Sequence, residues 1–60
     1  MKTYIFSFVG EENGKKIIKD IREEVSVCED LQGIKQMHAM ALEIEFGHPW
    51  RCVEIREVES

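Results

Sequence analysis

Aromatic and aliphatic residues alternate along the first stretch of the chain, which predicts a β-strand from about residue 2 to residue 9. One face of this strand is aromatic and consists of Tyr4, Phe6 and Phe8. The opposite face carries Ile5 and Val9 among smaller polar residues. Because both faces are apolar, we expect the aromatic face to form the core and the other face to need a second cover.

A turn signal follows this strand. Asn13 and Gly14 end the segment "GEENG", which begins at Gly10. Asn-Gly pairs favour hairpins because both residues tolerate positive φ angles. The segment predicts a hairpin with a connection of about four or five residues.

Residues 15–27 fit two kinds of element. As a strand, the segment places Ile17, Ile21 and Val25 on one face. As a helix, it groups the same residues with Ile18 and Cys28 on one stripe. The preceding turn requires a partner for the first strand, so we favour the strand and keep the helix as the alternative.

Residues 26–46 predict an amphipathic helix. Ser26 and Glu29 match a capping box, in which each side chain satisfies an exposed amide at the helix start. Gly47 and Pro49 supply the stop signal, since glycine accepts the left-handed conformation and proline cannot continue a helix.

The apolar stripe of this helix determines which side should meet the sheet. Steps of about 100° per residue align one set of residues, Ile34, Met37, Ala41 and Ile44. Further apolar residues, Leu31, Met40 and Leu42, widen the stripe on its two flanks. This arc is broader than a single sheet contact requires.

The chain closes with an alternating segment at residues 50–59, which predicts a third strand. Val53 and Ile55 share one face, and Trp50 and Cys52 share the other. The order β-β-α-β predicts one α+β domain over residues 1–60, in which one helix packs on one face of a three-stranded, mostly antiparallel sheet. The alternative order is β-α-α-β, with residues 15–27 helical.

Apolar surface left uncovered by a single helix predicts an interface with another protein surface, most simply a second copy of the chain. Trp50 follows a constrained loop, and tryptophan and arginine are typical interface anchors. The alternative for Trp50 is a plug at the end of the core. The residues that we assign to this interface are Ile5, Val9, Met40, Trp50, Arg51 and Cys52.

The net charge of −4 makes nucleic acid a less favoured partner than protein. Nucleic-acid binding without sequence preference requires a basic stripe, and the acidic balance disfavours it. An alternative use of the chain would rest on a basic edge formed by Lys15, Lys16, Lys19 and Arg22. We expect neither a membrane span nor a signal peptide, and the two cysteines suit the reducing cytoplasm.

Cysteine and histidine residues raise a second alternative, a metal-binding or thiol-redox protein. The candidates are Cys28, His38, His48 and Cys52. They lack the close pair of ligands with which structural zinc sites usually begin. We therefore expect no metal, no cofactor and no catalytic residue.

These observations together predict a small, acidic, cytoplasmic and non-enzymatic protein-binding module that forms a homodimer. The small size suggests a phage or mobile-element protein that modulates a host protein.

Overall fold

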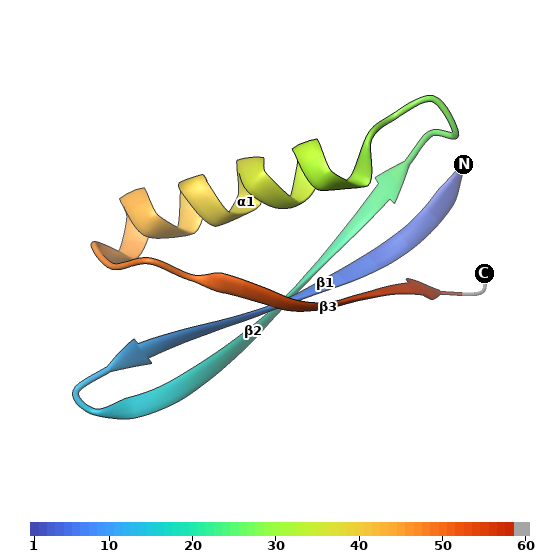
Figure 1. Ribbon diagram of the computed structural model, residues 1–60. Coiled ribbons are helices and arrows are strands. Elements are labelled where there is room, and N and C mark those ends of the chain that lie inside the picture. The colour runs from blue at the N-terminus through green and yellow to red at the C-terminus, as the bar shows by residue number, and fades with distance from the viewer. Residues whose placement is uncertain (59–60) are drawn as a thin grey trace.

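The computed structural model describes residues 1–58 and contains a three-stranded antiparallel sheet with one helix. The elements follow in the order β1 (Lys2–Glu12), β2 (Lys15–Val25), α1 (Leu31–Phe46) and β3 (Arg51–Val58). The sheet order is β2-β1-β3, so the first strand lies in the centre. Helix α1 lies across one face of the sheet (Figure 1). The predicted α+β fold is confirmed, and residues 15–25 form the strand rather than the alternative helix.

The hairpin between β1 and β2 is tighter than the sequence predicted. Only Asn13 and Gly14 lie between the strands, and their φ angles are 52° and 77°. Two consecutive positive φ angles belong to the type I′ turn, whose twist matches that of the flanking strands. The expected longer loop was wrong because Gly10 to Glu12 continue the strand and Glu12 pairs with Lys15.

The core lies between α1 and the aromatic face of β1. Phe6 and Phe8 are completely buried, and they contact Leu42 of the helix and Trp50 of the following loop. Tyr4 is half-buried and packs at the margin of this cluster. The predicted aromatic core face is therefore confirmed.

The helix begins later than the sequence predicted. Asp30 is the N-cap residue, and its carboxylate accepts a hydrogen bond of 3.1 Å from the backbone N–H of Gln32. Ser26 instead accepts a backbone hydrogen bond from Glu29 within a turn. The predicted end is confirmed, because Gly47 adopts a left-handed φ of 78° and its N–H donates to the carbonyl of Glu43.

A β-bulge in β3 shifts the phase of the last strand. Ser7 of β1 pairs with Glu54, but Phe8 pairs with Cys52, so Val53 has no partner on β1. The extra residue turns Cys52 to the same face of the sheet as Ile55, and both pack against the core. The predicted pairing of Val53 with Ile55 on one face was therefore wrong.

Candidate protein-interaction site

The outward side of α1 carries an exposed apolar stripe. We call this the outer stripe, and it consists of Met37, Met40, Ala41 and Ile44. The exposed fractions are 54% for Met37, 58% for Met40 and 83% for Ile44. Residues three and four apart lie on one face of a helix, so these side chains form one continuous surface.

The helix is therefore rotated relative to the sequence prediction. The residues that pack against the sheet are Leu31, Ile34, Ala39 and Leu42. Of the predicted stripe, Ile34 and the flanking Leu31 and Leu42 contact the core. Met37, Ala41 and Ile44 face away from it. His38 also lies on the inner side, where its ring is 6.0 Å from that of Phe6. Polar residues on the inner side and apolar residues on the outer side obscured the true phase.

The margins of the outer stripe are acidic. Glu43 and Glu45 flank it and are exposed. A shallow hollow at its C-terminal end is lined by Glu43 together with Met40 and Ile44. The cationic side chain of the helix, Lys35, lies instead in the groove between α1 and β3. The stripe is thus a methionine-rich apolar surface bordered by carboxylates.

His38 does not lie at this margin. Its Nε2 lies 2.5 Å from the Oε2 of Glu23 on β2, so the two side chains form a hydrogen bond. The bond connects the inner side of α1 with the sheet, and both side chains are about one-quarter exposed. Its role is to fix the helix on the sheet rather than to face a partner.

Three of the predicted interface residues lie together at the groove between α1 and β3. Trp50, Arg51 and Cys52 form one wall, and the helix supplies the other through Lys35 and Ala39. Arg51 is exposed and Cys52 is half-buried. The groove therefore contains two cations, Lys35 and Arg51, whereas the hollow on the outer stripe contains a carboxylate, Glu43.

Trp50 belongs to the core, as the alternative interpretation of the sequence proposed. Trp50 is 7% exposed. Its ring stacks on that of His48 and packs against that of Phe46, with 5.3 Å between the ring centroids in each pair. An indole that is already covered by its own chain offers no anchor to a partner. The assignment of Trp50 to an exposed interface was therefore wrong.

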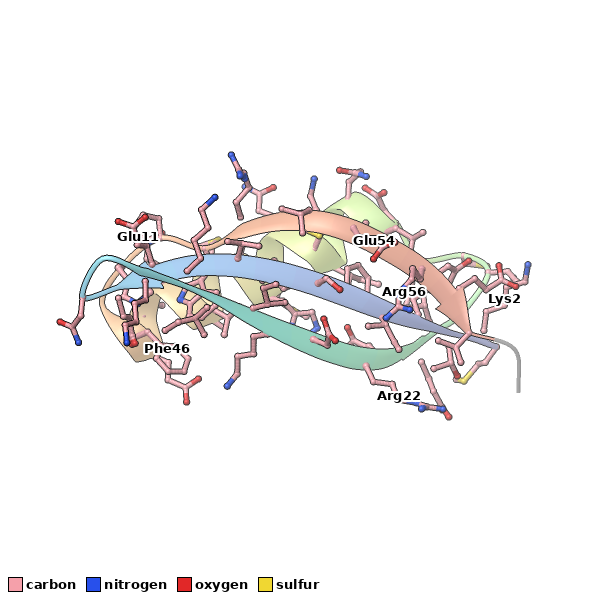
Figure 2. The ribbon with its side chains drawn as sticks, turned by 90° about the horizontal axis from the view of Figure 1, so that it is seen from below. Lys2, Glu11, Arg22, Phe46, Glu54 and Arg56 are labelled. Atoms are coloured by element: carbon pink, nitrogen blue, oxygen red, sulfur yellow. The ribbon has the colours of Figure 1, made fainter. Side chains whose placement is uncertain are left out.

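Ile5 and Val9 lie on the open face of the sheet, opposite the helix. Both are half-buried. Ile5 pairs with Arg22 of β2 on one side and with Arg56 of β3 on the other. Figure 2 labels both arginines. Ile5 and Val9 therefore cannot share one binding surface with Met40, which lies on the far side of the helix. Mixed charges on the open face are typical of a solvated surface.

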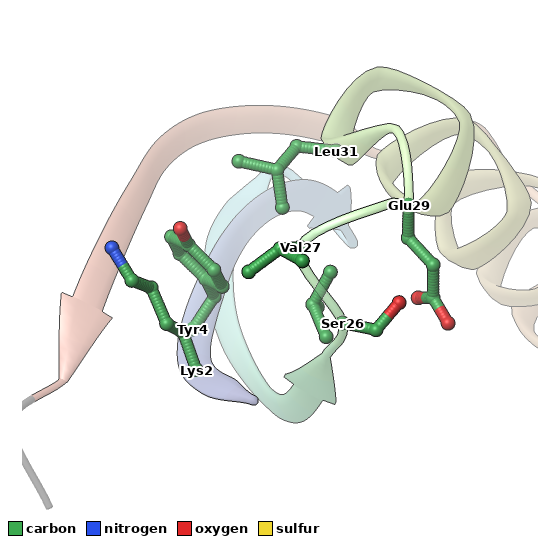
Figure 3. Close-up of a pocket in the computed structure, with 7 residues that line it drawn as sticks. Lys2, Tyr4, Ser26, Val27, Glu29 and Leu31 are labelled. Atoms are coloured by element: carbon green, nitrogen blue, oxygen red, sulfur yellow. The ribbon is translucent and has the colours of Figure 1, made fainter.

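A pocket of about 300 Å³ opens between the start of α1 and the N-terminal end of the sheet (Figure 3). Tyr4, Val27 and Leu31 supply much of its wall. Lys2 at its rim forms an ion pair of 3.5 Å with Glu57. Ser26 and Glu29 supply the polar part of the lining on the opposite side from Lys2.

The cations of the alternative nucleic-acid site do not form one surface. Lys15 and Lys16 lie opposite Glu12 and Glu11 across the hairpin. Lys19 lies with its Nζ 5.1 Å from the centre of the Phe46 ring, on the helix side of the sheet. Alternation along β2 places Arg22 on the opposite face. Each cation therefore has its own local environment.

The candidates for the metal or thiol alternative are also separated. Cys28 is exposed in the loop before α1, whereas Cys52 lies in the groove beside β3, and both are free thiols. His48 stacks on Trp50, and its Nε2 lies 3.8 Å from the Oε1 of Glu12. Within residues 1–58, no three cysteine, histidine, aspartate or glutamate side chains gather in a way that could hold an ion.

The helix found within residues 1–58 does not have the length and apolar character that a membrane span requires. Comparison of the chain with protein-family models, curated proteins and solved structures finds no match.

Proposed function

We propose that this chain is a small protein-binding module whose outer stripe receives an amphipathic helix with basic margins from another protein. The observation that carries this proposal is the exposure of Met37, Met40 and Ile44 in one line along α1. Large apolar side chains that lie together on a surface are typical of interaction sites. Methionine suits such a surface because its flexible side chain adapts to different partners.

The shape of the outer stripe favours a helical partner. Gly33, Met37, Met40 and Ile44 follow spacings of four, three and four residues. This is the spacing with which one helix packs along another. Gly33 has no side chain, so the partner can approach α1 closely at the N-terminal end of the stripe.

The charge at the margins selects the partner. Glu43 and Glu45 flank the stripe, and no lysine or arginine of α1 lies beside it. A second copy of α1 would bring carboxylates against carboxylates, which costs free energy. Lysine or arginine at the margins of the partner would pair with these glutamates and steer the encounter. The partner at this site is therefore a basic amphipathic helix rather than a second α1.

The module also acts as a homodimer in this proposal, through a surface other than the outer stripe. The chain exposes 4554 Å². A compact protein of 7.0 kDa is expected to expose about 4,000 Å², so the excess is about 500 Å². A thin domain with one helix over long strands has this excess, and association of two copies would reduce it.

Titration with a synthetic peptide tests the proposed site. The probe is a helical peptide with leucines along one face and lysines at both margins, added to isotope-labelled protein and followed by amide chemical shifts. We expect the largest shifts at Met37, Met40, Ala41 and Ile44. A peptide of the same leucine pattern with glutamates at the margins serves as the control and should bind at least tenfold more weakly.

Two matched variants locate the site independently. Ile44 and Val53 are both exposed apolar residues, on the helix and on β3. We expect Ile44→Asn to weaken peptide binding about tenfold, because an apolar contact is lost, and Val53→Asn to leave it unchanged. Shifts confined to the open sheet face, or equal losses in both variants, would contradict the proposal.

A further inference from the structure

The sheet ends in two free edges, and β2 provides the longer unbroken one. The order β2-β1-β3 leaves β2 and β3 each with one side unpaired. β2 pairs with β1 without interruption from Lys15 to Val25, whereas β3 is shorter and carries the bulge at Val53. Bulges protect edges from further pairing, and a regular free edge invites it.

We propose that two copies of the chain pair antiparallel through their β2 edges, centred on Ile21. This inference deepens the proposed homodimer by naming the surface that joins the copies. A two-fold axis through the centre would be perpendicular to the sheet, so the two sheets would form one continuous sheet with both helices on the same face. The charges and apolar side chains at directly opposed positions decide which register is favoured.

The charges along β2 match in this register. Asp20 would lie opposite Arg22 of the second copy, and symmetry repeats the contact on the other side of the axis. Lys19 would lie opposite the second copy's residue 23, which is a glutamate. Opposite charges at directly opposed positions stabilise a strand pair, and here they do so on both faces of the sheet.

The apolar residues on the helix side of β2 lie opposite one another in this register, whereas Ile18 on the open face lies opposite Glu24 of the second copy. Ile21 would meet its own copy at the axis, and Ile17 would lie opposite Val25 of the second copy. All three residues lie on the helix side, where Val25 is already buried by its own chain, so the new apolar contact rests on the half-buried Ile17 and Ile21. The two cores would then join across the β2 edges beneath the two helices.

Neighbouring registers lack this complementarity. Directly opposed residues must face the same side, so the centre can move only one residue at a time along β2. A centre at Asp20 places two carboxylates opposite each other, and centres at Lys19 and Arg22 each oppose two like cations. Like charges directly opposite destabilise a strand pair. Among centres from Lys19 to Arg22, the register centred on Ile21 is therefore the one without like charges at the axis.

Cysteine cross-linking tests the register. Cys28 and Cys52 are first replaced by serine, and Ile21→Cys is then introduced into this chain. Opposed residues of an antiparallel pair lie about 4.5 or 5.5 Å apart between Cα atoms, within the range that a disulfide spans. We expect Ile21→Cys to convert most of the protein to a covalent dimer under mild oxidation.

Ile55→Cys is the matched control. Ile21 and Ile55 both pair with Phe6, lie on the same face and occupy opposite edges of the sheet. Ile55→Cys should remain monomeric on non-reducing gels. Equal cross-linking of the two variants, cross-linking at residue 55 alone, or none at either position would overturn the β2 interface.

Charge reversal supplies a second measurement that does not depend on cysteine. Arg22→Asp would place Asp20 opposite a carboxylate in both symmetric pairs, and we expect the dimer dissociation constant to rise about tenfold. The combined change Asp20→Arg with Arg22→Asp should restore most of the affinity. Arg56→Asp makes the same charge change on β3, on the other side of Ile5, and should have little effect.

Sedimentation across a range of concentrations gives the readout and separates this inference from the proposed function. A species of 7.0 kDa at all concentrations would overturn the homodimer, although binding of the basic peptide to the outer stripe would still be measured. If Arg22→Asp and Arg56→Asp weaken the dimer equally, the homodimer stands but the β2 interface is contradicted. A dimer that responds only to Arg22→Asp would support it.

Discussion

The six-membered ring of the Trp50 indole lies directly against the backbone of Gly10. A Cβ atom at residue 10 would come within 2.7 Å of Cδ2 and within 2.9 Å of two further ring atoms. Both residues are buried, and the indole also packs on the rings of Phe46 and His48. The absence of a side chain at residue 10 is therefore what allows the indole to close the end of the core.

Gly10→Ala should destabilise the fold for this reason. The methyl group must displace a ring held between the sheet and the end of the helix, and overpacking of this kind costs about 1–3 kcal/mol. Urea unfolding followed by tryptophan fluorescence measures the change, since Trp50 is the single tryptophan of the chain. Gly33→Ala is the control: a Cβ there would have Asp30 as its neighbour at 3.8 Å, and alanine should stabilise the helix by about 0.5–1 kcal/mol.

Gly14→Ala should destabilise the β1–β2 hairpin through backbone conformation alone. No atom lies within 4 Å of a Cβ built at Gly14, so the substitution creates no collision. Its φ of 77° is costly for a residue with a side chain, and we expect a loss of about 1–2 kcal/mol in thermal or urea unfolding. Gly14→Asn should lose less, because asparagine tolerates positive φ. Equal losses for alanine and asparagine would contradict this explanation.

Asp30→Ala should lower stability by about 1 kcal/mol, because it removes the acceptor for the N–H of Gln32 at the helix start. Ser26→Ala, four residues earlier, should change stability by less than half as much. Unfolding of both variants by urea, followed by circular dichroism, measures the difference. A larger loss at Ser26 would mean that the helix begins where the capping-box pattern places it.

The hydrogen bond between His38 and Glu23 should appear as a coupling in a double-mutant cycle. We expect His38→Gln and Glu23→Gln to show a coupling free energy of about 0.5–1.5 kcal/mol, the usual net value for a part-buried hydrogen bond. The exposed pair Lys2 and Glu57, 3.5 Å apart, is the comparison and should show a coupling near zero. Equal couplings in the two cycles would mean that the contact does not hold the helix to the sheet.

The fold could be predicted because its strongest signals are local. Alternation around Phe6 and Phe8, the Asn13–Gly14 turn and the Gly47 stop each depend on a few neighbouring residues, and the structure confirms all three features. Of these three features, only the turn differed in detail, because its loop is shorter than predicted. Nothing in a single sequence distinguishes a strand that ends at Val9 from one that continues through Gly10 into the turn.

The orientation of the helix could not be predicted because α1 is apolar on two sides. Leu31 and Leu42 mark the inner side, but His38 stands between them and weakens the pattern. Met37 and Ile44 form an equally regular line on the outer side. The sequence signal that could have resolved this choice was His38 itself, since a glutamate on a neighbouring strand can bind an inward-facing histidine.

The candidate site was only partly predicted for the same reason. Met40 is exposed as the sequence analysis expected, and Arg51 and Cys52 lie together in the groove beside β3. The bulge at Val53 places Cys52 on the same face of β3 as Ile55. No residue pattern within a short strand predicts such a shift. Whether Trp50 is buried or exposed depends on the size of the space above Gly10, and this space is defined only by the packed structure.

The central position of β1 has a consequence for synthesis of the chain on the ribosome. The tight turn at Asn13 and Gly14 allows β1 to pair with β2 as soon as both strands have emerged. The other edge of β1 stays unpaired until β3 is made, and β3 follows the whole helix in the sequence. Until then Phe6 and Phe8 are shielded on one flank only, and an emerging hairpin with an open aromatic flank is a target for chaperones. Nascent chains from which residues 51–58 have not yet emerged should therefore bind such factors, and chains with a C-terminal extension that holds these residues outside the ribosome should release them.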